Sequence, residues 1–268
     1  MSGLDLREAA AFAESILKST GEICRRYFRT SLAVEAKADA SPVTVADRTV
    51  EARLRAAIAG RYPEHGIVGE EQGSTAADAA RVWVVDPIDG TKAFITGNPL
   101  FGTLVALLEH GRPVLGIVDM PALGERWIGL RGQGTLFRSG LLGPAPTTVE
   151  AFVRKGRPIE TSVLRSTSPH YFNETDAPAF ERLRRRCGLT LYGGDCYSYG
   201  QLAAGFVDLV AETGLAPYDF LALVPVVKGA GGIATDWSGR PLGLDSDGRV
   251  LMAADPALHA AALQLLTA

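Results

Sequence analysis

The stretch that constrains this chain most is Val82–Gly97, with the sequence VWVVDPIDGTKAFITG. Its four leading apolar residues, ending at Val85, are typical of a short buried strand, and the Pro- and Gly-containing segment after them marks the strand's end. Asp86 and Asp89 then stand at the carboxyl end of a strand, where open α/β sheets place their ligands. The stretch therefore predicts a site at the edge of a sheet.

The residues around this strand end have the chemistry of a phosphate site with metal ions. Asp89, Gly90 and Thr91 can present backbone N–H groups and a hydroxyl, which suit a phosphate. Asp86 and Asp89 are paired hard oxygen ligands, and beside such a cradle they indicate Mg²⁺-assisted phosphoryl chemistry. The alternative is that Asp89-Gly90 only forms a turn after a strand.

Three further acids could join this pair. Glu70 closes the apolar segment 67–69 and becomes a third ligand if that segment is a strand beside Asp86, although adjacent glutamates are most often solvated. Glu212 ends another expected strand, and Asp219 follows it after a Gly/Pro loop, at a helix N-terminus that favours carboxylates. We expect Glu70 and Asp219 to converge with Asp86 and Asp89 on the first strand end.

Asp47 has two interpretations. It lies three residues after Thr44, which is the spacing of an N-cap and a first-turn acid. Val50, Leu54 and Ile58 then form the buried stripe of a helix. On this segment alone, a purely structural carboxylate at a helix start is favoured.

Composition narrows the functions open to the chain. Its 268 residues, 47% of them hydrophobic and 21% charged, suffice to bury a sizeable core. A net charge of −3 gives no electrostatic footprint for nucleic acid. No apolar stretch reaches membrane-spanning length, the N-terminus is too charged for a signal peptide, and the three cysteines fit reduced thiols. We expect a cytoplasmic protein that binds neither nucleic acid nor membrane.

The first half of the chain is expected to be helical and then sheet-forming. Residues 4–28 show helical apolar spacing, and the small, polar residues 73–80 indicate a mobile surface loop. Glycine-punctuated apolar runs predict an antiparallel meander at 104–108, 114–118, 127–130 and 135–137. Residues 139–160 could join two halves, about 1–140 and 141–268, of a single domain over 1–268.

The second half alternates expected strands and helices. Arg182, Arg184, Arg185 and Arg186 lie on one of the helices, where a solvated face is favoured over a cation that meets substrate phosphate across a subunit boundary. Pro225 is expected to kink the apolar helix. The expected elements are a strand at 162–165, a helix at 176–187, a short helix near 200, a strand at 207–211, an apolar helix at 221–227, strands at 233–235 and near 250–253, and a helix at 256–267.

Three blocks of residues together resemble the inositol monophosphatase superfamily: Gly69–Glu71, Asp86–Thr91, and Tyr218-Asp219 followed by Gly229–Gly232. The resemblance covers nearly the whole chain, in the family's order and spacing. It implies a layered α-β-α-β-α sandwich of the inositol monophosphatase/fructose-1,6-bisphosphatase type. It also implies Mg²⁺-dependent hydrolysis of a small-molecule phosphate monoester, inhibition by Li⁺ and a homodimer.

The same resemblance implies roles for individual residues, position by position. The implied ligands of two or three Mg²⁺ ions are Glu70, Asp86, the Ile88 carbonyl, Asp89 and Asp219. The implied catalytic residues are Asp47 and Thr91, which orient the attacking water, together with Glu70. The residues expected to touch the substrate are Gly90, Thr91, Asp195, Glu212 and Asp219.

Within the superfamily, the chain is most similar to the histidinol-phosphatase branch, on the stretches 86–97, 123–129, 167–172, 192–200 and 216–232. This similarity implies conversion of histidinol phosphate to histidinol and phosphate, a step of histidine biosynthesis. Asp195 and Glu212 are the candidate partners of the substrate's ammonium group. Tyr218 stands where inositol phosphatases usually have Trp. Lys228 replaces a common acid and is also unusual for the histidinol branch, so the chemistry is indicated more strongly than the substrate.

Other functions stay open at this point. Haloacid dehalogenase-type phosphatases use DxDGT, with two acids two residues apart, whereas Asp86 and Asp89 are three apart. This spacing argues against an aspartyl nucleophile and favours direct attack by a metal-activated water. The remaining alternatives are an inositol-1-phosphatase, a phosphatase of another small molecule such as 3′-phosphoadenosine 5′-phosphate, for which the sequence offers no added basic patch, and a metal-binding regulator without turnover.

Overall fold

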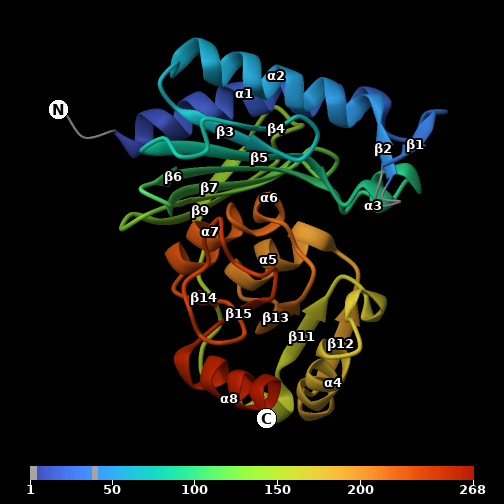
Figure 1. Cartoon of the computed structure of the whole chain (residues 1–268), viewed down its shortest axis with the longest axis vertical. Coiled ribbons are helices and arrows are strands. Elements are labelled where there is room, and N and C mark those ends of the chain that lie inside the picture. Colours follow the sequence, from blue (N-terminus) through green and yellow to red (C-terminus); the bar gives the residue numbers. More distant parts are fainter. Residues whose placement is uncertain (1–4, 38–41) are drawn as a thin grey trace.

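The computed structural model describes residues 5–37 and 42–268, and its elements lie in layers (Figure 1). From one side of the molecule to the other, the layers are α1 and α2, an eight-stranded sheet, a middle layer of α5–α7, a five-stranded sheet, and finally α4 and α8. This order confirms the expected α-β-α-β-α sandwich. The helices are α1 (Leu6–Tyr27), α2 (Val45–Arg61), α3 (Thr91–Ile95), α4 (Asp176–Arg186), α5 (Asp195–Ala203), α6 (Pro217–Phe220), α7 (Leu223–Gly229) and α8 (Pro256–Thr267).

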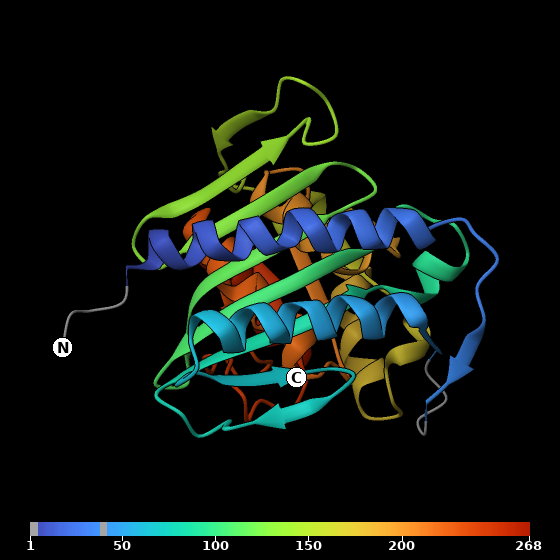
Figure 2. The same cartoon turned by 90° about the horizontal axis from the view of Figure 1, so that it is seen from above.

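The larger sheet has the order β10-β9-β8-β7-β6-β5-β3-β4. Its pairs are antiparallel except β3 with β5, which is parallel, so the predicted meander is confirmed as β6–β9. Helices α1 and α2 run side by side across its outer face (Figure 2). The strands are β3 (Gly66–Gly69), β4 (Gly73–Thr75), β5 (Arg81–Asp89), β6 (Gly102–Glu109), β7 (Arg112–Met120), β8 (Glu125–Leu130), β9 (Gly134–Ser139) and β10 (Thr147–Glu150).

Several expectations for the first half need correction. Residues 73–80 are not simply a loop, because β4 pairs with β3 although all its residues are exposed. The joining segment 139–160 contains β10, which is equally exposed. A separate hairpin of β1 (Val34–Ala36) and β2 (Pro42–Thr44) precedes α2. Helix α1 begins at Leu6, and position 4 of the expected helix lies outside the described residues.

The smaller sheet has the order β12-β11-β13-β15-β14 and joins parallel and antiparallel pairs. Four of its strands match the predicted ranges closely, and β12 was not predicted. Helices α4 and α8 cover its outer face (Figure 1). The strands are β11 (Val163–Ser166), β12 (Leu189–Tyr192), β13 (Leu209–Glu212), β14 (Ile233–Thr235) and β15 (Val250–Ala253).

The apolar helix expected at 221–227 is divided differently from the prediction. The chain forms two short helices, α6 and α7, with the break at residues 221–222. Pro225 is the third residue of α7. A proline is tolerated in the first turn of a helix because the N–H groups there have no intrahelical partner. Pro225 therefore does not kink the helix, and the break precedes it.

Strand β5 is buried on both faces, which explains its unbroken apolar run. Successive side chains of a strand point to opposite faces. Trp83 and Val85 accordingly join the core under α1 and α2, whereas Val82 and Val84 join the core that packs on α5 and α7. The apolar side chains of β5 are thus buried in these two cores. Separately, none of the described helices is long and apolar enough to cross a bilayer.

Helix α7 lies unusually close to the larger sheet because two strands carry glycine where it crosses them. A Cβ at Gly116 of β7 would overlap the carbonyl group of Ala222, and one at Gly129 of β8 would overlap the backbone of Pro225. Interiors packed to this density resist added atoms, because neither backbone can move without displacing the core. These two glycines therefore fix the distance between the sheet and the middle helix layer.

We expect Gly116→Ala to lower the free energy of unfolding by about 2–3 kcal/mol, the upper part of the range for overpacked cores. Urea unfolding followed by circular dichroism measures this loss. The matched control is Gly60→Ala near the end of α2, where no atom lies within 4 Å of the added Cβ. The control should be neutral or gain about 0.5 kcal/mol, because alanine is the better helix former. Equal stability of the two variants would contradict the close approach of α7.

Candidate active site

Strand β5 brings two carboxylates to one place because its pairing with β6 shifts at its end. Asp86 pairs with Leu104 and Asp89 with Gly102, so three steps along β5 match two along β6. Such a bulge accommodates one extra residue and re-aims the side chains around it. The N–H of Ile88 donates to Asp86 Oδ1 at 3.0 Å, which fixes the bulged segment. Asp86 and Asp89, which a regular strand would send to opposite faces, thus approach one another.

Asp219 reaches the same place from α6, which lies directly beneath β5 (Figure 1). Carboxylate oxygens of Asp86, Asp89 and Asp219 lie within 4.8 Å of one another. Each carboxylate is held by a backbone donor: Asp89 Oδ2 accepts from the N–H of Cys196 at 2.7 Å, and Asp219 Oδ2 from the N–H of Ala216 at 2.7 Å. Two acids of one strand and a third from a distant part of the sequence therefore share one small volume.

This cluster fits a divalent cation. Burial raises the pKa of Asp86 and Asp89 well above the usual value, and neighbouring carboxylates add to the shift. Burial likewise raises the pKa of Asp219 to about 7. Crowded carboxylates of this kind resist ionisation unless a cation shares the site. The donors are all oxygen atoms, which are the ligands that Mg²⁺ prefers.

Glu70, directly after β3, borders the cluster without joining its tightest group. Its charge and its hydrogen bond contribute to the raised pKa of Asp86, after burial. Lys37 Nζ lies 2.7 Å from Glu70 Oε1 and 2.6 Å from Glu71 Oε1, so one ammonium bridges both acids. Lys37 was not predicted. Its partners lie more than thirty residues away in sequence, which leaves no local signal.

Asp47 caps α2, as its spacing predicts, and its second carboxylate oxygen contacts Thr91. It is fully buried in the first turn of α2, and its Oδ2 accepts from the Thr44 N–H at 2.8 Å and the Thr44 hydroxyl at 2.6 Å. Its other oxygen, Oδ1, lies 3.3 Å from Thr91 Oγ1, which also lies 3.1 Å from the Ile88 carbonyl oxygen. Since a hydroxyl has one proton, Thr91 donates to one of these acceptors at a time.

The acids open into a cavity of about 640 Å³, a size suited to a small metabolite. Gly90 lies on its wall with φ +81°, and a Cβ there would lie 3.1 Å from the Asp195 carboxylate, so both conformation and space favour glycine. The predicted site residues that line the cavity are Glu70, Asp89, Gly90, Thr91, Asp195, Glu212 and Asp219.

The two acids of the far wall differ from exposed carboxylates. Burial raises the pKa of Glu212 to about 7, although Glu212 Oε1 accepts from both the N–H and the hydroxyl of Thr167 at 2.7 Å. Burial raises the pKa of Asp195 to about 6, and the ammonium of Lys92 opposes the shift. Both acids would gain from a cation in the cavity, because a positive charge favours their ionised forms.

Two cavity features were missed by sequence reasoning. Thr167 orients Glu212, and Lys92 Nζ donates to the Tyr171 hydroxyl at 2.8 Å, which ties α3 to the segment after β11. Thr167 and Tyr171 both lie in the stretch 167–172, which was used only to define a resemblance. Threonine and tyrosine at these positions form no motif that predicts a role. Their contacts with Glu212 and α3 become visible only in the fold.

The arginine run of α4 points elsewhere. Arg182 donates to the carbonyl oxygens of Leu265 and Ala268, and Arg184 pairs with Glu181 on its own helix. Within the described ranges, the cavity lining includes none of the four arginines. In a single copy of the chain, the solvated-face interpretation therefore holds, and α4 packs with α8 on the outer side of the smaller sheet (Figure 1).

Comparison with known proteins gives a consistent result. The family model described as the inositol monophosphatase family matches residues 5–268. The bifunctional phosphatase IMPL2 of Arabidopsis thaliana is 44% identical over 99% of this chain and 77% of that protein. The histidinol-phosphatase of Mycobacterium tuberculosis is 37% identical over 89% and 90% of the two chains. An inositol monophosphatase structure from Zymomonas mobilis superposes with a TM-score of 0.87, at 42% identity over 99% of this chain and 100% of that one. The chain belongs to the inositol monophosphatase family and is a phosphatase of that superfamily.

Proposed function

We propose that this phosphatase hydrolyses histidinol phosphate to histidinol and phosphate. The observation that carries the proposal is the pairing of two sets of acids in one cavity. One set, Asp86, Asp89 and Asp219, suits metal ions and a phosphate, and the other, Asp195 and Glu212, suits a cationic group. Similarity to histidinol-phosphatases supports the same substrate.

We infer that two or three Mg²⁺ ions bind to the carboxylates of Glu70, Asp86, Asp89 and Asp219 and to the Ile88 carbonyl. When bound, such ions supply charge neutralisation and Lewis acidity to the phosphate and lower the pKa of a coordinated water. Members of the family generally depend on Mg²⁺, and the acidic cluster agrees with that dependence.

The chain's own residues would bind and orient the reactants. The backbone N–H groups at Gly90 and Thr91 begin α3 and would hold phosphate oxygens. When the Thr91 hydroxyl donates a hydrogen bond to Asp47, its oxygen can accept a hydrogen bond from the attacking water, and as the water attacks, its proton would pass to Thr91 while the Thr91 proton passes to Asp47. Because the Asp47 carboxylate is anchored by Thr44, the water would be held in one orientation.

The far wall would select the alcohol part of the substrate. Asp195 and Glu212 would pair with the ammonium group of histidinol phosphate, and such a pair gains strength in a largely buried cavity. Inositol 1-phosphate is the second candidate, because the Glu212 carboxylate can equally accept hydrogen bonds from hydroxyl groups and the Zymomonas mobilis relative is described as an inositol monophosphatase. Values of kcat/KM for both substrates, measured with and without Mg²⁺, test the proposal. Absence of turnover on every monoester would favour a metal-binding regulator.

Two further proposals concern organisation. We propose that residues 1–268 form one domain, with halves at about 1–140 and 141–268, and that two copies form a homodimer. Cooperative urea unfolding followed by two spectroscopic probes tests the first. Sedimentation equilibrium of the purified protein tests the second, and a monomer at micromolar concentration would contradict it.

Mg²⁺ should stabilise the folded protein. At a concentration of 100 times Kd, a ligand of the folded state adds about 2.7 kcal/mol. Burial raises the pKa of Asp219 above its unfolded value, so the metal-free fold loses stability as pH rises toward about 7, and the gain from Mg²⁺ should be larger at pH 8 than at pH 5.5. Asp219→Asn should raise Tm in EDTA and remove the gain. The control, Asp78→Asn on the exposed 76–80 segment, should behave as wild type in thermal melts.

Asp47→Asn should lower kcat by about 10²–10⁴-fold, the usual contribution of a positioned acid–base group, with little change in KM. The amide keeps the shape of the side chain but accepts the Thr91 proton less well. Steady-state kinetics measures the loss. An unchanged Tm shift with Mg²⁺ would separate a catalytic defect from a lost metal site, and full activity in the variant would exclude Asp47 from the reaction.

Asp195→Asn should reduce kcat/KM for histidinol phosphate about tenfold or more, and for inositol 1-phosphate much less. A charge-assisted hydrogen bond contributes about 1.5–3 kcal/mol to binding. Only histidinol phosphate carries an ammonium group, so only this substrate would lose such a bond. Parallel kinetics on the two substrates gives the ratio. Equal losses on both would remove the role of Asp195 in recognising the ammonium group.

A further inference from the structure

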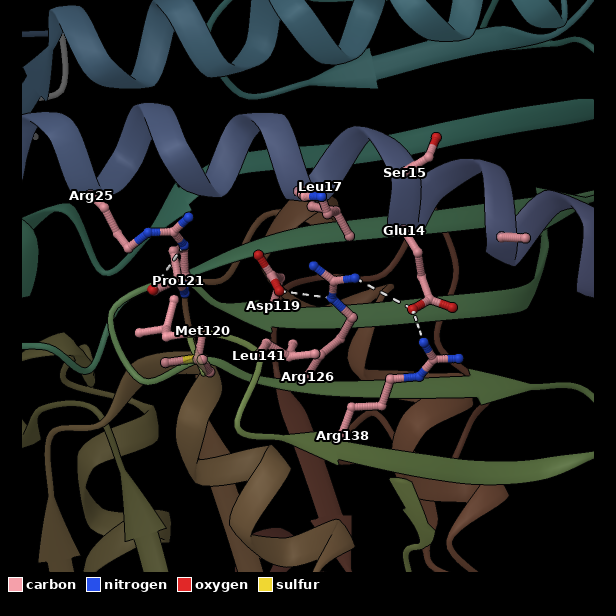
Figure 3. Close-up of a pocket in the computed structure, with 14 residues that line it drawn as sticks. Glu14, Ser15, Leu17, Arg25, Asp119, Met120, Pro121, Arg126, Arg138 and Leu141 are labelled. Atoms are coloured by element: carbon pink, nitrogen blue, oxygen red, sulfur yellow. Dashed lines mark hydrogen bonds and ion pairs between the residues drawn. The ribbon is translucent and has the colours of Figure 1, made fainter. Parts of the chain in front are cut away.

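A second cavity lies beside α1, on the outer face of the larger sheet, which faces away from the smaller sheet. Its volume is about 460 Å³, and α1, the end of β7, the start of β8 and the segment after β9 form its walls (Figure 3). In the described part of the chain, it shares no lining residue with the cavity at β5. The two cavities are therefore distinct, although Met120 of this lining contacts Cys196 of the other.

The walls of this α1 cavity carry more positive than negative charge. Four cationic side chains face two carboxylates in a protein whose net charge is −3. A local excess of cations in an acidic protein attracts anions, and the low-dielectric walls of a cavity strengthen that attraction. The cations are Lys18, Arg25, Arg126 and Arg138, and the acids are Glu14 and Asp119.

Two arginines are held in fixed orientations by a ladder of ion pairs (Figure 3). Arg126, which is buried, lies 2.8 Å from Asp119 Oδ1 and 3.4 Å from Glu14 Oε2, and Arg138 lies 2.9 Å from the same oxygen of Glu14. A guanidinium has five N–H donors, and these contacts occupy only some of them. The ladder thus orients planar donors whose geometry matches a carboxylate or phosphate.

Some polar groups of the cavity are left unsatisfied. Within residues 5–37 and 42–268, the buried Nε of Arg138 has no hydrogen-bond partner. Lys18 is exposed, so its ammonium is hydrated and also available to a ligand. Arg25 Nη1 donates only to the Pro121 carbonyl, at 3.3 Å. An ion-pair network that served the fold alone would be expected to satisfy its buried donors, because each unmet donor costs about 1–3 kcal/mol. The free donors point to an external acceptor.

The rest of the lining is apolar and would accept the body of a ligand. Pockets for small molecules combine such surface with a few convergent polar groups. Leu142 is 54% exposed, so part of this apolar lining is accessible from outside. The apolar lining residues are Ala11, Leu17, Met120, Pro121, Leu141 and Leu142.

We propose that the α1 cavity is a second ligand site, for a small organic anion. A carboxylate or phosphate group binds to the guanidinium groups of Arg25, Arg126 and Arg138, and an apolar body covers Leu141 and Leu142. Carboxylate and phosphate ligands would both present anionic oxygens on an apolar molecule. The experiment below distinguishes these two kinds of anion.

Isothermal titration calorimetry tests the site with three probes that share a phenyl ring: phenylphosphonate, benzoate and the neutral benzamide. The protein is first dialysed against EDTA and then into chelator-free buffer, which removes the divalent ions through which a phosphonate would bind at β5 and leaves no competing polycarboxylate. We expect the anions to bind and benzamide not to. Arg25→Gln should weaken anion binding about tenfold, the loss expected for one charge-assisted hydrogen bond. The matched control is Arg26→Gln, the next residue on α1, which is exposed and does not line the cavity. It should bind as wild type does.

Lys18→Gln is an independent variant at an exposed position of the lining, and the loss of its positive charge should also weaken anion binding. Crystals soaked with the tighter anion should show it against Arg126. The proposal fails if benzamide binds as well as benzoate, if Arg25→Gln and Arg26→Gln bind alike, or if the anion lies only among the β5 acids. It also fails if no probe binds while Arg25→Gln dissociates an oligomer in sedimentation, since the cavity would then be a subunit contact.

Discussion

Mutual repulsion among Asp86, Asp89 and Asp219 is the constraint on which the rest of this molecule depends. Their oxygens lie within 4.8 Å of one another in a largely dry place, which is an unfavourable arrangement until a cation joins it. The fold must therefore hold the three acids together against their charge. It does so with backbone donors and with two packed sheets, and a bound cation would relieve the repulsion between the carboxylates.

Close packing between the helices and the larger sheet holds the three acids in place. Strand β5 has core on both faces, so its end cannot shift without disturbing packing above and below. Gly116 and Gly129 let α7 approach the larger sheet, which brings the neighbouring α6 and its acid up to β5. The precision of the site thus comes from helix-to-sheet contacts remote from the carboxylates. Functional sites built on rigid helices and strands are generally more precise than sites on loops.

Local patterns predicted the parts of the structure that they control. Periodicity gave β5, the meander and α2, since the buried faces of these elements impose alternation or helical spacing. It missed β1, β4 and β10, which are exposed along their whole length and form only because a neighbouring strand accepts their hydrogen bonds. Lys37 and Thr167 escaped for a related reason: their acidic partners lie 33 and 45 residues away in sequence. The acids themselves were found because strand ends and helix starts are visible in sequence.

The bulge at the end of β5 also has a chemical consequence. Two acids separated by a single residue could share a face of a perfectly regular strand. With the acids three positions apart, the bulge is what brings them together, and it also releases a stretch of backbone from the strand's ladder. In that stretch, the Ile88 carbonyl oxygen lies 3.1 Å from the Thr91 hydroxyl. The longer motif thus places a neutral carbonyl oxygen in the same bulge as two carboxylates, which a regular strand with the acids two positions apart would not do.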